Sequence, residues 1–445
     1  MTPRKTVLLA MYDGGGNVPA LLAIAEELLK REHRVIVLAG PFFGETGPSP
    51  SLVERARALG CDVHELEIDE SRAPDVPPQR GLFAGRTGRW FGPLQYTYSI
   101  YRDAWRWAEV AAELCAAERV DVVAADDMLP GALVGAESAG VPSCSLMHTV
   151  YFFRPAKGLP PPGMGLDPPS NFGHRVRDRL LARVMSRVYR RDGLPGLNAA
   201  RDRVGLQPIA HPWDQHARAK KVIVLTSRHF DFVAESLPAN VEYSGMPFAS
   251  EPAGDALSSS PKGPPIVLVG LSTSSLEQTA TAQAALDALA PLPVRSIITM
   301  TGSLTPGALR LPANAEAFGF LPHSQVMPRV TAVVTHGGHG TVLTALKHGK
   351  PLVCVPIYFD QSDIARRVQR RGIGIDVGRR HTAPAIRAAV QRVLSEPAFA
   401  TNARGIAQRI ASERGAEHAA SIIEREAGML PAMNTRLPEA DVAAR

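Results

Sequence analysis

The sequence lacks the features that mark several common classes of protein. Its 445 residues include only four cysteines, scattered without C-x-x-C spacing, so neither a zinc cluster nor a disulfide framework is expected. No uninterrupted run of about 18 apolar residues occurs, which argues against a membrane-spanning helix. The apolar run at the start ends at Tyr12-Asp13-Gly14 without a small-residue cleavage site and predicts a first strand. We expect a reducing compartment, the cytoplasm.

A strong charge of one sign is also missing. The formal net charge is +6, and 41 of the 49 basic residues are Arg in an Ala-rich chain, which fits codon bias as well as a polyanionic partner. Hydrophobic residues make up 45% and charged residues 21%, as in globular proteins. We therefore expect no nucleic-acid partner, and the length predicts two domains.

The N-terminal half has the pattern of a parallel α/β sheet. An amphipathic helix over 18–31 stands between apolar runs at 5–11 and 34–39, and further strand patterns follow at 119–125 and 141–146. A Pro-, Gly- and Ser-rich stretch at 244–264 then predicts an interdomain linker.

The α/β pattern restarts beyond the linker, so a second doubly wound domain is expected over 265–398. Its predicted elements alternate between apolar strands and helices: 266–270, 277–290, 294–300, 331–335, 340–348, 351–355 and 361–371. Residues 399–428 are predicted to form a C-terminal helix that packs back on the N-terminal domain, and 429–445 a frayed tail.

The segment 335–341, Thr-His-Gly-Gly-His-Gly-Thr, lies between an apolar strand and a helix. Gly338 and Gly340 would allow close backbone approach to a ligand, and the following helix offers free N–H groups to an anion. His336 and Thr341 add side-chain donors, as a diphosphate requires. A Gly-rich turn with a capping Thr is the alternative.

Asp360-Gln361 follows the next strand, at the edge where open α/β sheets bind ligands. A carboxylate beside an amide can accept from and donate to vicinal hydroxyls. The alternative is an N-cap for the next helix.

These motifs resemble those of the inverting, family-1 nucleotide-sugar glycosyltransferases, particularly bacterial ones that decorate natural products. The signature H-G-G-x-G-T, A-L-x-x-G-x-P and P-x-x-x-D-Q is matched at 336–341, 345–351 and 356–361. Residues 319–323 are similar to the segment whose aromatic residue stacks on the nucleobase, with Phe320 and His323 in place of the usual Trp and Gln. Ser272-Thr273 and Thr301-Gly302 resemble the loops beside the diphosphate and the base.

The resemblance implies a GT-B fold, in which two doubly wound Rossmann-like domains face each other across a cleft. Residues 1–243 would bind the acceptor and 265–398 the nucleotide sugar, with inversion at the anomeric carbon. No Asp-x-Asp triplet occurs, so we expect no metal, and no cofactor beyond the sugar donor. The lipid-linked N-acetylglucosaminyltransferases, which the glycine-rich start also resembles, are a minor alternative.

The acceptor is expected to be a large aromatic or apolar aglycone. Eight aromatic residues, including three of the four Trp, lie between 83 and 107, and three more follow at 151–153. Core packing is the alternative. The predicted acceptor contacts are Gly16, Asn17, Trp90, Phe91, Tyr151 and Phe152.

The expected general base is absent. Family members carry G-H-x-x-P after the first strand, but here Gly16 or Asn17 stands at the His position, and neither can take a proton. Asp126 and Asp127 are the first candidates to replace it, followed by Asp13 and His148. On other interpretations Asp126 caps a helix and His148 is a plain turn residue. A non-catalytic homologue that binds a nucleotide or a partner enzyme is the second functional class.

Residues 172–191 predict a basic amphipathic helix. Seven Arg lie between 175 and 191, and Val176, Leu180, Val184 and Val188 share one face. Weak contact with a membrane surface and packing on the N-terminal domain with solvated Arg both fit this pattern. The sequence also allows a homodimer.

Overall fold

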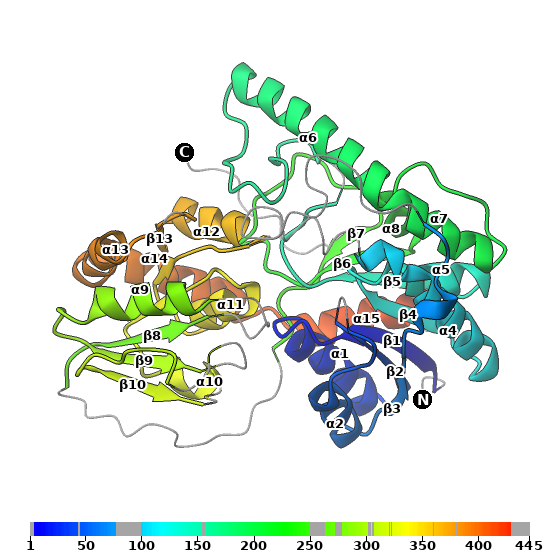
Figure 1. Ribbon diagram of the computed structural model, residues 1–445, viewed down its shortest axis with the longest axis horizontal. Coiled ribbons are helices and arrows are strands. Elements are labelled where there is room, and N and C mark those ends of the chain that lie inside the picture. Colours follow the sequence, from blue (N-terminus) through cyan, green and yellow to red (C-terminus); the bar gives the residue numbers. More distant parts are fainter. Residues whose placement is uncertain are drawn as a thin grey trace.

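The computed structural model places two α/β domains beside each other (Figure 1). It describes residues 4–42, 45–76, 99–153, 156–248, 263–271, 278–300, 304, 307–319, 321, 323–358, 360–379 and 381–428.

The N-terminal domain is built on a seven-stranded parallel sheet of order β3-β2-β1-β4-β5-β6-β7. Its order reverses between β1 and β4, and such a switch point opens a crevice at the carboxyl ends of the strands. The strands are β1 (Thr6–Tyr12), β2 (Arg34–Gly40), β3 (Asp62–Glu65), β4 (Val122–Asp126), β5 (Ser143–Met147), β6 (Lys221–Val224) and β7 (Val241–Tyr243).

The C-terminal domain repeats this plan with a six-stranded parallel sheet of order β10-β9-β8-β11-β12-β13. Its switch point lies between β8 and β11. The strands are β8 (Ile266–Gly270), β9 (Arg295–Thr299), β10 (Ala315–Phe318), β11 (Ala332–Thr335), β12 (Leu352–Cys354) and β13 (Gly374–Asp376). The predicted fold class, two doubly wound domains, is therefore confirmed.

Helices join and cover the strands of both sheets (Figure 1). In the N-terminal domain they are α1 (Val18–Lys30), α2 (Pro50–Ala58), the short 3-10 helix η1 (Glu70–Arg72), α4 (Ala104–Ala117), α5 (Pro130–Ser138), α6 (Phe172–Asp192), α7 (Leu194–Arg203) and α8 (Trp213–Arg218). In the second half they are α9 (Thr279–Leu289), α10 (His323–Val326), α11 (His339–Lys347), α12 (Gln361–Arg370), α13 (Ala383–Ser395), α14 (Pro397–Ile410) and α15 (Gly415–Glu426).

The central strands are the ones that the sequence identified best. β1, β4 and β5 are buried along almost their whole length, because both faces of a parallel sheet are covered by helices. Such strands appear in the sequence as continuous apolar runs. The edge strands β3 and β10 have only four residues each, none of them fully buried, and polar residues interrupt both, so no apolar run marked them.

The prediction of one C-terminal helix over 399–428 was wrong in part. The segment forms two helices, α14 and α15, separated at 411–414. α14 packs on α11 and α13 of the C-terminal domain, and only α15 crosses to α1 and strands β4 to β6. Glu424 of α15 fixes this crossing, because its carboxylate accepts from Arg31 at 2.6 Å and bonds His33 at 2.8 Å.

A buried ion pair also joins the two domains. Arg367 of α12 donates to the Asp231 carboxylate at 2.6 Å, and both side chains are nearly inaccessible to solvent, at 4% and 1% exposed. The segment before α6 reaches the same helix, since the amides of Gly163 and Gly165 donate to Asp363. These contacts fix α12 against the N-terminal domain.

Some predictions fall outside the described residues, namely most of the linker and the tail over 429–445. Within the described part of the chain, no helix is both long and apolar enough to cross a bilayer.

Candidate functional site

The carboxyl edges of the two sheets meet at one junction, which we call the junction site. It is formed by the loop after β1, the ends of β4 and β5, the loop after β11 and the start of α12. The hydroxyl of Thr149, after β5, donates to the carboxylate of Asp360, at the start of α12. A Cβ on Gly340 would lie 3.6 Å from the carbonyl oxygen of Gly16, so these two loops face each other across the domains.

The loop after β11 is shaped by its glycines. Gly337 has φ +89°, in the left-handed region, and a Cβ there would approach the carbonyl of Gln361 to 2.9 Å. A Cβ on Gly338 would lie 2.3 Å from Nε2 of His336, so only glycine allows the buried imidazole to fold over the loop. Thr341 lies in the first turn of α11, and no side chain caps that turn. Its free N–H groups and dipole are suited to an anion.

The second histidine of the motif, His339, makes a contact between the domains. Its Nε2 bonds the hydroxyl of Thr226 in the N-terminal domain at 2.8 Å. Burial lowers the pKa of His339 to about 3, so it is neutral. One of the two His in this motif therefore joins the domains.

The sequence offered two roles for the pair Asp360-Gln361, ligand binding and capping of the next helix, and the two side chains differ in their contacts. Asp360 occupies the N-cap position of α12 without a side-chain capping bond, and its carboxylate contacts Thr149 instead. The side-chain oxygen of Gln361 accepts from the amides of Ile357 and Tyr358 at 2.8 and 2.9 Å. That oxygen fixes the loop, which leaves the amide nitrogen of Gln361 and the Asp360 carboxylate for a ligand.

Asp126, Asp127 and His148 form a compact charged cluster at the switch point of the N-terminal sheet. Nδ1 of His148 lies 3.1 Å from a carboxylate oxygen of each aspartate. Both carboxylates are 0% exposed, whereas the His148 side chain is 22% exposed. Because Nδ1 is itself buried, the exposed part of the ring lies elsewhere. Nε2 has no hydrogen-bond partner among the described residues, so it is the nitrogen available to a substrate.

The electrostatics of the cluster follow from this arrangement. Burial alone would lower the pKa of His148, but Asp126 and Asp127 outweigh burial and hold that pKa well above its usual range. Burial raises the pKa of Asp127, although His148 opposes the rise. The two aspartates therefore stabilise an imidazolium, the state of a histidine that has accepted a proton.

The loop after β1 explains the missing family histidine. Nδ2 of Asn17 donates to Asp126 at 2.9 Å and to the Tyr12 carbonyl at 3.0 Å, and Oδ1 accepts from the Gly14 amide at 3.1 Å. Of the two residues that could stand at the histidine position, Gly16 and Asn17, only Asn17 has a side chain, and that side chain bonds Asp126. Its side chain is buried and its polar atoms bond within the protein, so its contact with an acceptor stays a prediction.

The other predicted base and acceptor-contact residues that the structure describes differ in how far they are exposed to solvent. Asp13 accepts from the Gly15 amide at 3.1 Å and shapes the loop, and Gly16 is exposed. Tyr151 is 5% exposed and packs in an apolar cluster with Met147 and Phe153, so core packing explains it. Only Phe152 keeps an accessible face.

The aromatic segment at 83–107 is also corrected in part. Trp105 and Trp107 are buried in the core formed by α4 and its neighbours. Several further predicted contacts lie outside the described residues or have undescribed side chains: Trp90, Phe91, Ser272, Thr273, Thr301, Gly302, Phe320 and His323.

Two residues at the junction site were missed by the sequence analysis. Tyr12 is buried, and this burial raises its pKa well above the usual value of 10. The nearby carboxylates, of which Asp126 has the largest effect, raise the pKa further. Thr149 bridges to Asp360. Position at the carboxyl end of β1 or just after β5 was the only signal for either residue.

Asp126, Asp127 and His148 are also the described residues that could share a cation, since one ligand atom of each lies within 4.8 Å of the others. In the structure these atoms pair with each other at 3.1 Å, which is ion-pair geometry. Their arrangement does not require a metal.

Comparison with known proteins agrees with this geometry. Residues 283–425 match the family described as erythromycin biosynthesis protein CIII-like, C-terminal domain. The chain is 30% identical over 441 residues to 4'-demethylrebeccamycin synthase of Lentzea aerocolonigenes, with 94% of this chain and 98% of that protein covered. The chain belongs to the family-1 glycosyltransferases of antibiotic biosynthesis. It is therefore an enzyme that transfers a sugar.

The fold of this glycosyltransferase is shared with solved structures. The glycosyltransferase of kitacinnamycin superposes with a TM-score of 0.71 at 20% identity, over 96% of this chain and 100% of that one. Glycosyltransferase VinC in complex with dTDP gives a TM-score of 0.67 at 17% identity, over 95% and 99%. These matches confirm the GT-B architecture. The enzyme prediction is confirmed over the non-catalytic alternative.

Proposed function

We propose that the enzyme moves a sugar, with inversion, from a nucleoside-diphosphate donor to a large aromatic or apolar aglycone. The observation that supports this most strongly is that the 336–341 loop and the His148 cluster belong to the same junction site. A Cβ on Gly340 would lie 3.6 Å from the carbonyl oxygen of Gly16, and Thr149, which follows His148, bonds Asp360. The loop suits a diphosphate, and the cluster suits a proton acceptor. A donor and an acceptor held at this junction would be next to each other.

In this mechanism His148 is the general base, and Asp126 and Asp127 orient it. Nε2 takes the proton of the acceptor as the acceptor atom forms its bond to the anomeric carbon. The bond from that carbon to the diphosphate breaks at the same time, and its electron pair leaves with the diphosphate. Attack from the face opposite the leaving group inverts the configuration. The sequence analysis placed Asp126 or Asp127 first, but their complete burial favours His148.

The leaving diphosphate would be stabilised by His336 and by the free N–H groups at the start of α11. Asp360 and the amide nitrogen of Gln361 would bind sugar hydroxyls. Support for a nucleotide donor comes from the dTDP in the VinC complex, a protein of the same fold. We propose no metal or other cofactor.

The acceptor class is supported by Phe152, which is half-buried and packs at a tilt against Phe153, with ring centroids 4.8 Å apart. A relative that covers nearly the whole chain is named for making 4'-demethylrebeccamycin. We propose an aglycone of comparable kind, contacted by Phe152 and by the exposed backbone of Gly16.

The direct test is incubation with a panel of nucleoside-diphosphate sugars and aromatic aglycones in the presence of EDTA. A nucleotide at 100 times its dissociation constant should stabilise the protein by about 2.7 kcal/mol, measurable as a thermal shift. The anomeric coupling in the proton NMR spectrum of the product reports the stereochemistry. Retention of configuration, or transfer abolished by EDTA, would contradict the proposal.

His336→Ala is expected to impair use of the donor far more than binding of the acceptor. Loss of one donor to a developing charge typically costs about 3 kcal/mol in the transition state, so kcat/KM for the nucleotide sugar should fall about 100-fold. His348→Ala, at the C-terminal end of α11, is the matched control and should change little. Equal losses for donor and acceptor would place His336 outside the diphosphate site.

The rate should depend on pH in a way set by the cluster. His148 accepts a proton only when neutral, and its raised pKa moves the acidic limb of kcat/KM above the ordinary histidine value of about 6.5. Asp127→Asn removes one of the charges that raise this pKa, so the limb should move to lower pH. A pH profile of kcat/KM for both proteins tests this. An unmoved limb would mean that Asp127 does not act on the base.

A further inference from the structure

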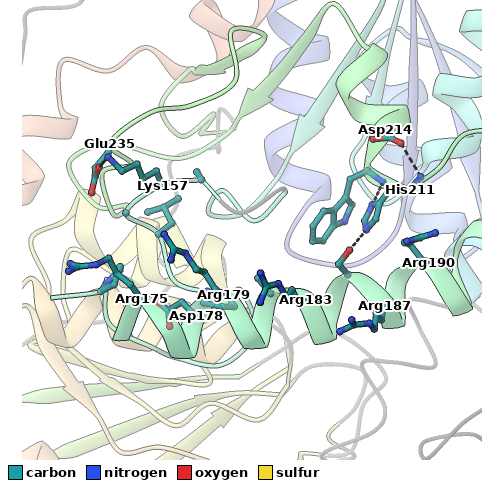
Figure 2. Close-up of a pocket in the computed structure, with 18 residues that line it drawn as sticks. Lys157, Arg175, Asp178, Arg179, Arg183, Arg187, Arg190, His211, Asp214 and Glu235 are labelled. Atoms are coloured by element: carbon teal, nitrogen blue, oxygen red, sulfur yellow. Dashed lines mark hydrogen bonds and ion pairs between the residues drawn. The ribbon is translucent and has the colours of Figure 1, made fainter. Parts of the chain in front are cut away.

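The second feature of the molecule with the properties of a binding site lies along α6, away from the junction site. A cavity of about 950 Å³, open on one side to solvent, is lined by α6, the segment 156–169, residues 211–214 at the start of α8 and Glu235 (Figure 2). None of the junction-site residues lines it. Its volume is in the range of pockets that hold small organic ligands.

One wall of this cavity is strongly basic. Arg175, Arg179, Arg183 and Arg187 lie four residues apart on α6 and all line it, together with Arg190 (Figure 2). None of the five has an ion-pair partner among the described residues, and all five are exposed. We call them the arginine row.

The row is not balanced by the acidic residues of its own helix. Asp178 pairs with Arg177 at 2.8 Å, and Asp192 pairs with Arg191 at 2.5 Å. Like charges four residues apart on a helix destabilise it, so an unpaired row of this kind opposes folding of α6. An anionic ligand would remove that repulsion.

The acids that face the row from other elements are also engaged. Glu235 is paired with Lys157 at 2.5 Å, and Asp214 accepts from the backbone amide of His211 at 2.9 Å. The guanidinium groups therefore outnumber the carboxylates at the cavity, and those carboxylates have other partners.

The opposite wall is apolar and contains a buried donor without an acceptor. Trp213 is 5% exposed and lines the cavity, and its indole N–H has no hydrogen-bond partner among the described residues. A buried indole N–H normally has one. The indole ring packs against the ring of His211, with centroids 4.7 Å apart. His211 accepts from the backbone amide of Trp213 at 3.2 Å through Nδ1 and bonds Ser186 at 3.1 Å through Nε2. Leu159 and Pro161 extend this wall.

We infer that the α6 cavity binds an organic anion that carries at least two negative charges on an apolar body. The arginine row would take the charged groups, the indole N–H would donate to an acceptor atom, and the apolar wall would cover the body. A phosphate monoester has this chemistry. It can come from a small soluble molecule or from the headgroup of a lipid, and exposed Leu180 and Val184 beside the row leave the second source open to test.

The test uses 1-naphthyl phosphate as the probe, measured by titration calorimetry on the full chain saturated with a nucleoside diphosphate to fill the donor site. We expect one binding site per chain. The triple variant Arg179→Gln, Arg183→Gln, Arg187→Gln should lose at least about tenfold in affinity, because charge-assisted bonds are lost. The triple variant Arg404→Gln, Arg409→Gln, Arg414→Gln removes the same charge from exposed positions around α14 and should bind like the wild type.

Two further measurements test the other wall and the source. Trp213→Phe keeps an apolar ring without the N–H and should weaken binding about three- to tenfold, and inorganic phosphate should bind more weakly than 1-naphthyl phosphate. Co-sedimentation with phosphatidylcholine vesicles containing phosphatidic acid, lost in the α6 triple variant, would identify a lipid headgroup as the source. If the wild-type protein does not co-sediment with these vesicles, the source is a soluble anion.

The inference is overturned if neither probe nor vesicle binding depends on the arginine row, if the nucleoside diphosphate abolishes probe binding, or if inorganic phosphate binds as tightly as the probe. Because the arginine substitutions remove repulsion within α6, the variant should fold, and circular dichroism checks that it does.

Discussion

Replacing His148 by Ala is expected to lower turnover by about 10²- to 10⁴-fold, the usual contribution of a general base. The reason is that His148 alone in the cluster combines a free ring nitrogen with access to solvent, while Asp126 and Asp127 are completely buried. Nucleotide binding, measured by thermal shift, should be unchanged because the donor loop belongs to the other domain. Single-turnover kinetics with a saturating donor measures the loss.

The same experiment distinguishes the base from its orienting partners. Asp127→Asn keeps the shape of the side chain and should lower turnover less than His148→Ala, while it moves the acidic limb of the rate profile. His348→Ala serves as the control for removal of a half-buried imidazole elsewhere. Wild-type turnover in His148→Ala, with a large loss in Asp126→Asn or Asp127→Asn, would return the role of base to the aspartates.

The second large effect is expected on stability. Asp231→Asn leaves Arg367 as a buried charge without its partner, and breaking a buried ion pair in this way typically costs about 3 to 5 kcal/mol. Within the N-terminal domain Asp231 also accepts from the hydroxyl of Tyr243 at 2.8 Å and from the amide of Tyr151 at 3.1 Å, so the same carboxylate bonds this domain and Arg367 of α12. Urea unfolding of the full chain measures the change.

A double variant tests whether the pair itself carries the effect. Asp231→Asn combined with Arg367→Met removes the uncompensated charge, so it should recover part of the stability lost in the single variant. Glu396→Ala, which breaks the exposed pair of Glu396 with Arg392, is the control and should change stability little. Additive losses in the double variant would mean that the two side chains do not depend on each other.

The loop over 336–341 could be predicted from the sequence because the residues that shape it are neighbours in the chain. The loop over 336–341 takes its shape from its own glycines, such as Gly338, which leaves space for the ring of His336. Its strand, loop and helix are consecutive in the chain. The motif therefore specifies both the structure and its chemistry, although His339 was not separable from His336 until its bond to Thr226 was seen.

The residue that we propose as proton acceptor, His148, could not be selected from local sequence in the same way. Asn17, Asp126 and His148 are distant in the sequence and meet because β1, β4 and β5 are neighbours in the sheet. Residue type and position at a strand end identified four candidates for the base: Asp126, Asp127, Asp13 and His148. Only their burial and contacts in the folded protein distinguish one from another. The same is true of the aromatic residues, where Tyr151 is in the core and Phe152 beside it is not.

The sequence by itself determined the two parallel-sheet domains, the glycine-rich loop over 336–341 and the family, because continuous apolar runs and a contiguous motif encode them locally. Tertiary structure alone decided that both aspartates lie against Nδ1 of His148, that Asn17 bonds Asp126, that α14 and α15 pack on different domains, and that a row of arginines on α6 lines a cavity. Each of these depends on contacts between residues far apart in the chain, and their burial and charge environment exist only once the sheets have formed and the domains have met.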